Sequence, residues 1–427
     1  MSASTISLAD YRAALTRPGV LVPTLLSALG RLPIAMFGLA TVLYVQRVSG
    51  SFATGGLVSA GVLAGVAVGS VLQGRVMDRF GATRPLIVVA ALFVVAVGAL
   101  VLAIESGHSL MTMVPAAVLS GLTSPALPGA SRALWSRLLP PGPRRDAAFS
   151  YEAISLEVFF ILGPALAVFL VTAPWPGTAL VAATLAMAVG SVGFALSPVV
   201  RAVRLVPGTG GSLGPLGALA RPGMRTVALA SLGFGVVAGS VEVGVPAVTT
   251  AAGSTVLGGI LLSAWSVTSV LAGLLYGLRP WPEPLHLRLP VLLGAFAVLV
   301  LAMALVGPSG SLVVLAVAML AAGAVITPQV TAHSIAVDRI APAGTATEAF
   351  GWVVTAAVLG VAAGQSLGGV VVEAAGPPAA FVAGGAAGLA LAAVVWMRRA
   401  TLAPDRVDND VVAIFGPAEQ QQGRCRR

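Results

Sequence analysis

Long apolar runs alternate with short polar breaks along the chain, and this alternation predicts its elements. Runs between charged or Pro/Gly-rich breaks give twelve spans, at residues 20–45, 52–74, 85–104, 110–131, 148–172, 177–197, 226–250, 255–278, 287–306, 311–334, 348–372 and 377–397. Each run has roughly 20 residues, the length that a helix needs to cross ~30 Å of hydrocarbon. The period-two alternation of barrel strands is absent from these runs. The pattern predicts an all-α integral membrane protein with twelve transmembrane helices.

Composition and charge agree with this class and exclude several others. Hydrophobic residues make up 57% of the chain and charged residues 9%, whereas a soluble domain has about a quarter of its residues charged. All basic residues are arginines scattered over loops, which argues for a lipid bilayer and against a nucleic-acid partner. The single cysteine, Cys425, leaves no metal-ligand cluster, so we expect no metal and no cofactor.

The connections offer no enzymatic site either. They are short, and the run PGTGGSLG at residues 207–214 lacks the Lys-Ser/Thr ending of a nucleotide-binding loop. We therefore expect neither an enzyme nor an ATP-driven pump.

The placement of the arginines predicts the orientation. If the amino terminus is cytoplasmic, every arginine except Arg31 and Arg47 falls in the termini, loops or helix ends on that side. Residues 1–18 lack the apolar core of a cleavable signal peptide. We expect a multi-pass protein of a bacterial plasma membrane, with both termini in the cytoplasm.

The chain also shows signs of an internal duplication. At an offset of 203 residues, Leu29-Gly30 aligns with Leu232-Gly233, Gly74 with Gly277 and Pro125 with Pro328. The longest connection lies between the two copies and contains a Gly-rich, flexible run. The expected organisation is a cytoplasmic segment at 1–19, a six-helix bundle at 20–197, a cytoplasmic linker at 198–225, a second six-helix bundle at 226–397 and a disordered cytoplasmic tail at 398–427.

A charged segment, GRVMDRFGATRPL at 74–86, connects the second and third spans. It resembles the loop between helices 2 and 3 of the major facilitator superfamily (MFS) of secondary transporters, whose pattern is G-x-x-x-D-R-x-G-x-R/K-R/K. The matching positions are Gly74, Asp78, Arg79, Gly81 and Arg84. Thr83 replaces the first basic residue of the final pair, and Pro85 follows Arg84. The resemblance implies two pseudo-symmetric bundles with a substrate site between them, and secondary active transport by alternating access. The simpler reading is a short basic turn.

Asp78 has a predicted partner in such a fold. The eleventh span begins after Gly344, and the N–H groups and dipole at a helix start attract a carboxylate. The segment would then act as a conformational latch that closes the cytoplasmic side. Arg79 and Arg84 could add charge contacts. Arg132 or Arg137 could compete for Asp78, and the sequence does not decide between them.

Two spans carry ladders of glycines four residues apart, which places each ladder on one helix face. The ladders are Gly61, Gly65 and Gly69 in the second span and Gly360, Gly364 and Gly368 in the eleventh. These two helices face each other in the resembled fold, so we expect both ladders to line the surface between the halves. Packing within each half is the alternative.

The fifth span contains Gly163-Pro164, which resembles the core of a Gly-Pro motif in helix 5 of proton-coupled exporters. The later glycine pair of that motif is replaced by Ala167-Val168, and a proline also kinks a helix for structural reasons alone. The resemblance favours export over uptake.

Ionisable side chains at membrane depth cost about 2.5–3.5 kcal/mol on insertion scales, so they usually have a partner or a task. Glu157 and Arg31 lie at similar depths in the fifth and first spans, and we expect them to pair and to couple transport to protons. A permanent structural pair is the alternative. Glu152, nearer the cytoplasmic end, has a structural role in this reading. Glu242 in the seventh span is a second candidate proton site.

Several other polar and aromatic side chains are weaker candidates for contact with substrate. They are Gln329, His333, Gln365 and Trp265. Taken together, the sequence predicts a monomeric transporter that exports a small amphipathic molecule in exchange for protons. A proton-coupled nutrient importer of the same fold, or a membrane sensor that binds a ligand without moving it, remains an alternative.

Overall fold

The computed structural model describes residues 7–107, 109–203, 214, 216–278, 284–306 and 311–403. Cys425, the tail beyond residue 403 and most of the linker lie outside this part of the chain. Within the described residues, twelve helices are long and apolar enough to cross a membrane. The fold is therefore the multi-pass helical type that the sequence predicts.

The first half of the chain contains α1 (Leu8–Leu15), α2 (Leu21–Ser49), α3 (Phe52–Phe80), α4 (Thr83–Glu105), α5 (Leu110–Leu122), α6 (Leu127–Leu138), α7 (Pro143–Val171), α8 (Thr178–Leu196) and α9 (Pro198–Ala202). The second half contains α10 (Pro222–Ala251), α11 (Thr255–Leu278), α12 (Leu285–Met303), α13 (Leu312–Ile340), α14 (Ala346–Ala375) and α15 (Pro378–Met397). Short 3₁₀ turns are η2 (Gly217–Ala220), η3 (Ala304–Val306) and η4 (Arg399–Leu402).

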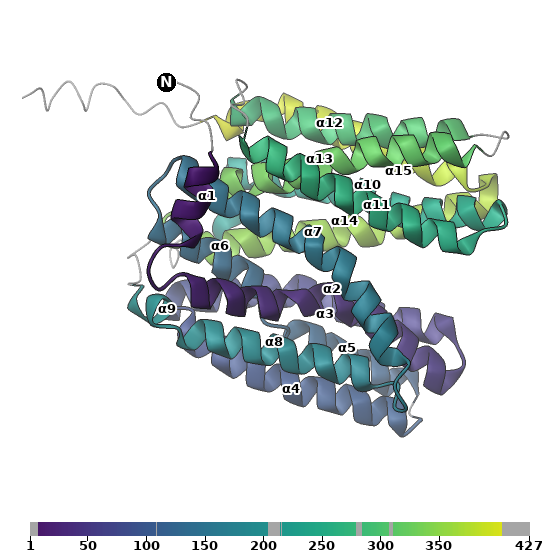
Figure 1. The fold of residues 1–427 in the computed structure, drawn as a ribbon, viewed down its shortest axis with the longest axis horizontal. Coiled ribbons are helices and arrows are strands. Elements are labelled where there is room, and N and C mark those ends of the chain that lie inside the picture. The colour runs from purple at the N-terminus through teal and green to yellow at the C-terminus, as the bar shows by residue number, and fades with distance from the viewer. Residues whose placement is uncertain are drawn as a thin grey trace, which may run out of the picture.

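The two halves lie side by side and repeat the same helix pairings (Figure 1). Helix α2 packs on α8 as α10 packs on α15, and α3 packs on α5 as α11 packs on α13. Between the halves, the contact of α3 with α14 matches that of α11 with α7. The bundles are therefore pseudo-symmetric, and the second span of each half packs against the fifth span of the other half.

The fourth span is broken between α5 and α6, although the sequence predicts one continuous helix at 110–131. Gln73 of α3 satisfies the backbone groups released at the break. Its Nε2 donates to the carbonyl oxygens of Leu122 and Ser124, both at 2.9 Å, and its Oε1 accepts from the Ala126 N–H at 2.8 Å. Water is absent from the hydrocarbon core, so such a break needs an internal partner.

Several helices extend further than the apolar pattern predicts. Helix α3 continues to Phe80 and α4 begins at Thr83, so the charged segment is mostly helical rather than a loop. Gly81 makes the turn between them with φ +83°, a conformation that side chains disfavour. Helix α7 begins at Pro143 rather than near residue 148. The hydrogen bonding of a helix can continue past the hydrocarbon, where charged side chains are hydrated.

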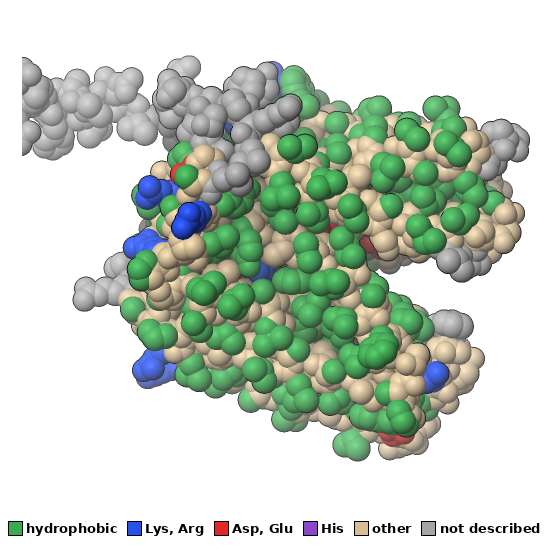
Figure 2. Space-filling view, in the orientation of Figure 1, with side chains coloured by type: hydrophobic (Ala, Val, Ile, Leu, Met, Phe, Trp, Pro, Cys, Tyr) green, Lys and Arg blue, Asp and Glu red, His purple; other side chains and the backbone are tan. Residues whose placement is uncertain are grey.

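The halves are closed at one end and separated at the other. Arginines gather at the end where α3, α6 and α13 stop and α7, α10 and α14 start; we call it the arginine-rich end. A core cluster there contains residues of both halves, among them Trp135 and Phe149 with Ala332 and Phe350. Figure 2 shows a cleft between the halves that opens at the opposite end. A molecule that enters the cleft from that end is stopped by the packed side chains at the arginine-rich end.

Candidate functional site at the interface between the halves

The carboxylate of Asp78, in the last turn of α3, contacts the first turn of α14. It accepts hydrogen bonds from the backbone N–H groups of Thr347 at 3.1 Å and Glu348 at 2.8 Å. These N–H groups have no partner inside the helix and carry the positive end of its dipole. Gly74, one turn earlier on α3, permits the approach, because a Cβ there would lie 2.7 Å from the Glu348 Cα. The predicted contact is present; we call Gly74, Asp78 and the first turn of α14 the latch.

The arginine that pairs with Asp78 comes from outside the charged segment. Arg137 of α6, one of the two competitors that the sequence left open, has its Nη2 3.4 Å from an Asp78 oxygen. Arg79 stacks instead on the ring of Phe80, 5.3 Å from its centroid, and Arg84 is exposed. The charge that faces Asp78 therefore comes from α6 of the same half.

Glu348 connects the latch to the end of the linker. Its Oε1 lies 3.0 Å from Arg75 Nε and accepts hydrogen bonds from the Ala218 N–H and Trp352 Nε1, both at 3.1 Å. Ala218 belongs to η2, which precedes α10. One carboxylate thus holds α3, α14 and the linker end together.

A second group of ion pairs joins the halves at the same end. Arg145 at the start of α7 lies 2.8 Å from Asp338 near the end of α13, and Arg339 lies 3.9 Å from Asp146. These ion pairs were not predicted from the sequence. The signal was there, because opposite charges adjoin the ends of two spans at 144–146 and 338–339.

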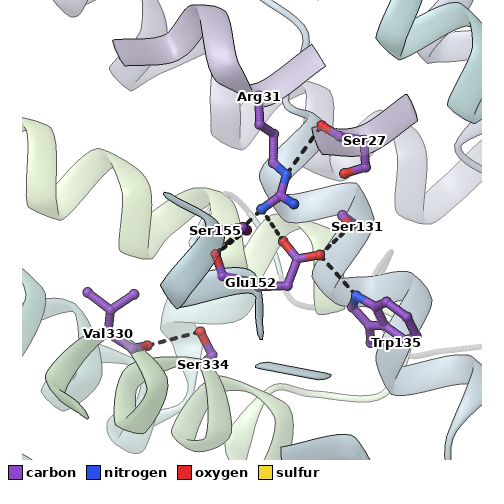
Figure 3. Close-up of polar contacts among 8 residues, drawn as sticks. All are labelled: Ser27, Arg31, Ser131, Trp135, Glu152, Ser155, Val330 and Ser334. Carbon is purple, nitrogen blue, oxygen red and sulfur yellow. Dashed lines mark hydrogen bonds and ion pairs between the residues drawn. The ribbon is translucent and has the colours of Figure 1, made fainter. Parts of the chain in front are cut away.

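Arg31 is buried and paired, but its partner is Glu152 rather than the predicted Glu157. Its Nη1 lies 2.5 Å from Glu152 Oε2, and both side chains are 1% exposed. The other carboxylate oxygen accepts hydrogen bonds from Ser131 at 2.7 Å and Trp135 at 2.9 Å (Figure 3). Helix α7 begins five residues earlier than predicted, which brings Glu152 to the depth of Arg31.

Glu157 faces the other half instead. Glu157 is 9% exposed, and its carboxyl lies near Ser266 and Ser269 of α11. Its surroundings are thus built jointly by α7 and α11, one helix from each half.

Glu242 lies on α10 and is exposed. Its Oε2 accepts a hydrogen bond from Gln365 Nε2 of α14 at 2.7 Å. Both candidate residues belong to the second half, so they form a polar pair within one bundle rather than across the interface.

The remaining cavity candidates differ in their surroundings. Gln329 and His333 lie one turn apart on α13 and are 0% and 3% exposed. Trp265 meets Phe296 edge to face, with centroids 5.9 Å apart, inside the core of the second half. Trp265 is therefore a packing residue in this structure rather than a cavity residue.

The glycine ladders do not line the interface between the halves, so that expectation is wrong. A Cβ at Gly65 would meet the backbone of Val118 in α5, and one at Gly364 would meet the backbone of Val236 in α10. Each ladder thus permits close packing within its own half. Other glycines lie at the interface. They are Gly74 and Gly351, and a Cβ at Gly351 would lie 2.6 Å from the backbone oxygen of Ser70.

Gly163 of α7 faces α2, where its Cβ would lie 2.7 Å from the Ala35 Cβ. Pro164 follows inside the same helix. The Gly-Pro pair therefore lets the first and fifth spans approach each other closely.

These features define a class: a helical membrane protein of two pseudo-symmetric six-span bundles, with a cleft between them and ionic contacts closing one end. The sequence profile of the Major Facilitator Superfamily matches residues 24–355. The chain belongs to this family. No protein of curated function matches the sequence.

Solved structures share the fold at low sequence identity. A bacterial homologue of the iron transporter ferroportin in an outward-facing state has a TM-score of 0.72 and 14% identity, covering 89% of this chain and 99% of that one. The human organic anion transporter MFSD10 has a TM-score of 0.68 and 16% identity, covering 91% and 100%. The E. coli fucose:proton symporter has a TM-score of 0.64 and 14% identity, covering 91% and 100%.

Proposed function

We propose that the chain exports a small amphipathic molecule by alternating access and exchanges it for protons carried by Glu157. The observation that carries the proton role is the buried position of Glu157 on α7, where this helix packs against α11 of the other half near Ser266 and Ser269. Because these helices belong to different halves, any rocking of the halves changes what surrounds this carboxyl. A proton site that couples to the conformational cycle needs this property.

The chemistry of the site suits two protonation states. A serine hydroxyl donates to a carboxylate and accepts from a carboxylic acid, so Ser266 can serve both forms of Glu157, whereas the Ser269 hydroxyl also bonds Thr327. A carboxyl enclosed in a low-dielectric site favours its neutral form, and water entry favours the ionised form. Arg31, which would hold Glu157 ionised, is already bound to Glu152. Glu157 is therefore better suited to exchange a proton than Glu152.

The state of the structure fits such a cycle. With the arginine-rich end in the cytoplasm, as the positive-inside rule favours, the open cleft faces outward. External protons then reach the cleft while the latch keeps the cytoplasmic side shut. The Gly163-Pro164 pair supports export by its resemblance to the exporter motif. The structural neighbours named for iron, organic anion and sugar transport show that the fold serves varied cargoes.

Everted membrane vesicles loaded with a pH-sensitive dye provide the test. After acidification of the lumen, a panel of lipophilic cations, organic acids and sugars is added, and proton release from the lumen is recorded. We expect at least one compound to release protons in wild-type vesicles and to be taken up into the lumen. Glu157→Gln should abolish the proton release, whereas Glu105→Gln, which alters a carboxylate at the far end of α4, should preserve it.

Other outcomes separate the alternatives. Loss of preloaded compound from the lumen together with protons would indicate an importer. Binding without flux would indicate a sensor. Full coupling in Glu157→Gln would refute the role of this residue and make Glu242 the next candidate.

A further inference from the structure

Arg132 is a buried guanidinium without adequate protein partners. Its side chain is 7% exposed, and its Nε has no hydrogen-bond partner. The ring of Phe350 lies 5.9 Å from its guanidinium carbon. Burying a charged donor without an acceptor is costly, so a group of this kind usually serves a ligand or a network. The carboxylate of the nearby Glu152 accepts from Arg31, Ser131 and Trp135 and leaves Arg132 Nε without a partner.

Other buried polar atoms around Arg132 also have no partner. Its charge acts on His333 across the interface and on Arg31 within its own half. His333 Nε2, Arg31 Nη2 and both side-chain amide atoms of Gln329 have no hydrogen-bond partner among the described residues. All of these side chains are at least nine-tenths buried. We call Arg31, Arg132, Gln329 and His333 the buried polar cluster.

The charges of this cluster do not balance. Arg31 and Arg132 bring two positive charges to the vicinity of one carboxylate, Glu152. A guanidinium presents its N–H groups in a planar fork that matches the two oxygens of a carboxylate. On α13 of the other half, the unpartnered Gln329 amide and His333 Nε2 offer a donor group and two acceptors. The cluster is therefore complementary to a carboxylate with a neighbouring hydroxyl, amino or similar polar group.

We propose that the buried polar cluster binds the carboxylate of the transported molecule, so that the substrate is an organic acid carried as its anion. The proposal rests on the transport function proposed above and specifies its substrate class. Arg132 lies six residues before the end of α6, about 9 Å along the helix from the arginine-rich end. Opening of that end would expose Arg132 to the cytoplasm. Closure would then bring Gln329 and His333 of the other half onto the bound acid.

Thermal unfolding of the full chain in detergent, followed by tryptophan fluorescence, tests this proposal. The probes are benzoate, nicotinate, mandelate, lactate, decanoate and glutamate, each compared with its own primary amide. We expect at least one carboxylate to raise the unfolding temperature of the wild-type protein by a few degrees, and its amide to have no such effect, because a ligand of the folded state stabilises it by mass action. Arg132→Gln should lose this shift, and Arg201→Gln, a change at an exposed position of α9, should keep it.

The unliganded variants provide an independent readout. Arg132→Gln should unfold at the same or a higher temperature than the wild type, because it removes a buried charge that lacks a partner. A structural arginine would behave in the opposite way. Gln329→Leu should reduce the carboxylate shift while leaving Arg132 in place.

Three results would overturn the proposal: no carboxylate stabilises the protein better than its amide, the shift survives in Arg132→Gln, or Arg132→Gln fails to fold. The first of these, combined with proton release driven by cations or sugars in vesicles, would leave the transport proposal intact. Conversely, Arg132-dependent carboxylate binding without any flux would support the site and refute transport.

Discussion

Replacing Gly74 with alanine tests whether close backbone packing holds the arginine-rich end shut. A Cβ at this position would lie 2.7 Å from the Cα and 2.8 Å from the N of Glu348. Carbon atoms in contact are about 3.5–4.0 Å apart, so α3 and α14 must separate by roughly 1 Å. Asp78, one turn along α3, now accepts hydrogen bonds at 2.8 and 3.1 Å. An added ~1 Å takes both beyond hydrogen-bonding distance.

The size of the effect follows from these two bonds. Hydrogen bonds to a charged group contribute about 1.5–3 kcal/mol each. Alanine stabilises the helix by about 0.5–1 kcal/mol relative to glycine, but it does so in both conformations, so this contribution does not change their ratio. Loss of the latch therefore favours opening of the arginine-rich end by about 3 kcal/mol or more, which is roughly a hundredfold change in the ratio of the two states.

Spin-label distance measurements on the purified protein, with Cys425 replaced by serine, detect this shift. One label pair at the exposed residues Ala202 and Ala343 spans the arginine-rich end, and another at Ser106 and Ala252 spans the opposite end. In Gly74→Ala the first distance should lengthen and the second shorten. Gly98→Ala is the control, because a Cβ at Gly98 meets nothing within 4 Å. Unchanged distances in Gly74→Ala would refute the latch.

Three further changes have expected outcomes. Asp78→Asn should fold normally but favour opening of the arginine-rich end by about 0.3–2 kcal/mol and slow turnover, measured with the same label pairs and by flux. Glu152→Gln should lower the free energy of unfolding by about 3–5 kcal/mol, because it leaves Arg31 charged and buried; an unchanged unfolding temperature would contradict this. Gly65→Leu should prevent stable folding, since a Cβ there already overlaps α5, whereas Gly56→Leu, at a position with nothing within 4 Å, should be tolerated in an expression and gel-filtration assay.

Hydropathy predicted the number and order of the spans because a helix that crosses lipid needs a long run of apolar side chains around its hydrogen-bonded backbone. It did not predict helix ends or the break in the fourth span. A helix that leaves the membrane keeps its hydrogen bonds while its side chains turn polar, so the apolar run stops before the helix does. The break at 123–126 depends on Gln73, a residue 50 positions earlier in the chain, and no local pattern reveals that contact.

The glycine ladders show a second limit. Their spacing correctly placed each ladder on one face of its helix, but spacing does not say which neighbour that face meets. On α3 the residues that contact α14 include Ser70, Gly74 and Asp78. At about 100° per residue they lie roughly opposite Gly65 on the helix wheel. One face of α3 thus packs within its half and the other faces α14. The contact with α14 was predicted only by the charged motif that contains Gly74 and Asp78.

The predicted partner of Arg31 was wrong because the predicted start of the fifth span was wrong. The apolar pattern predicts that the fifth span starts near residue 148, and Glu157 then lies nine residues inside the helix. The helix begins at Pro143, and the residue nine positions from that start is Glu152. Five residues correspond to about 7.5 Å of depth and to a turn of about 140° around the helix, which also aims Glu157 at α11 instead of α2. Depth was therefore a sound criterion for finding the partner of a buried charge, and the error in the helix start decided which carboxylate satisfied it.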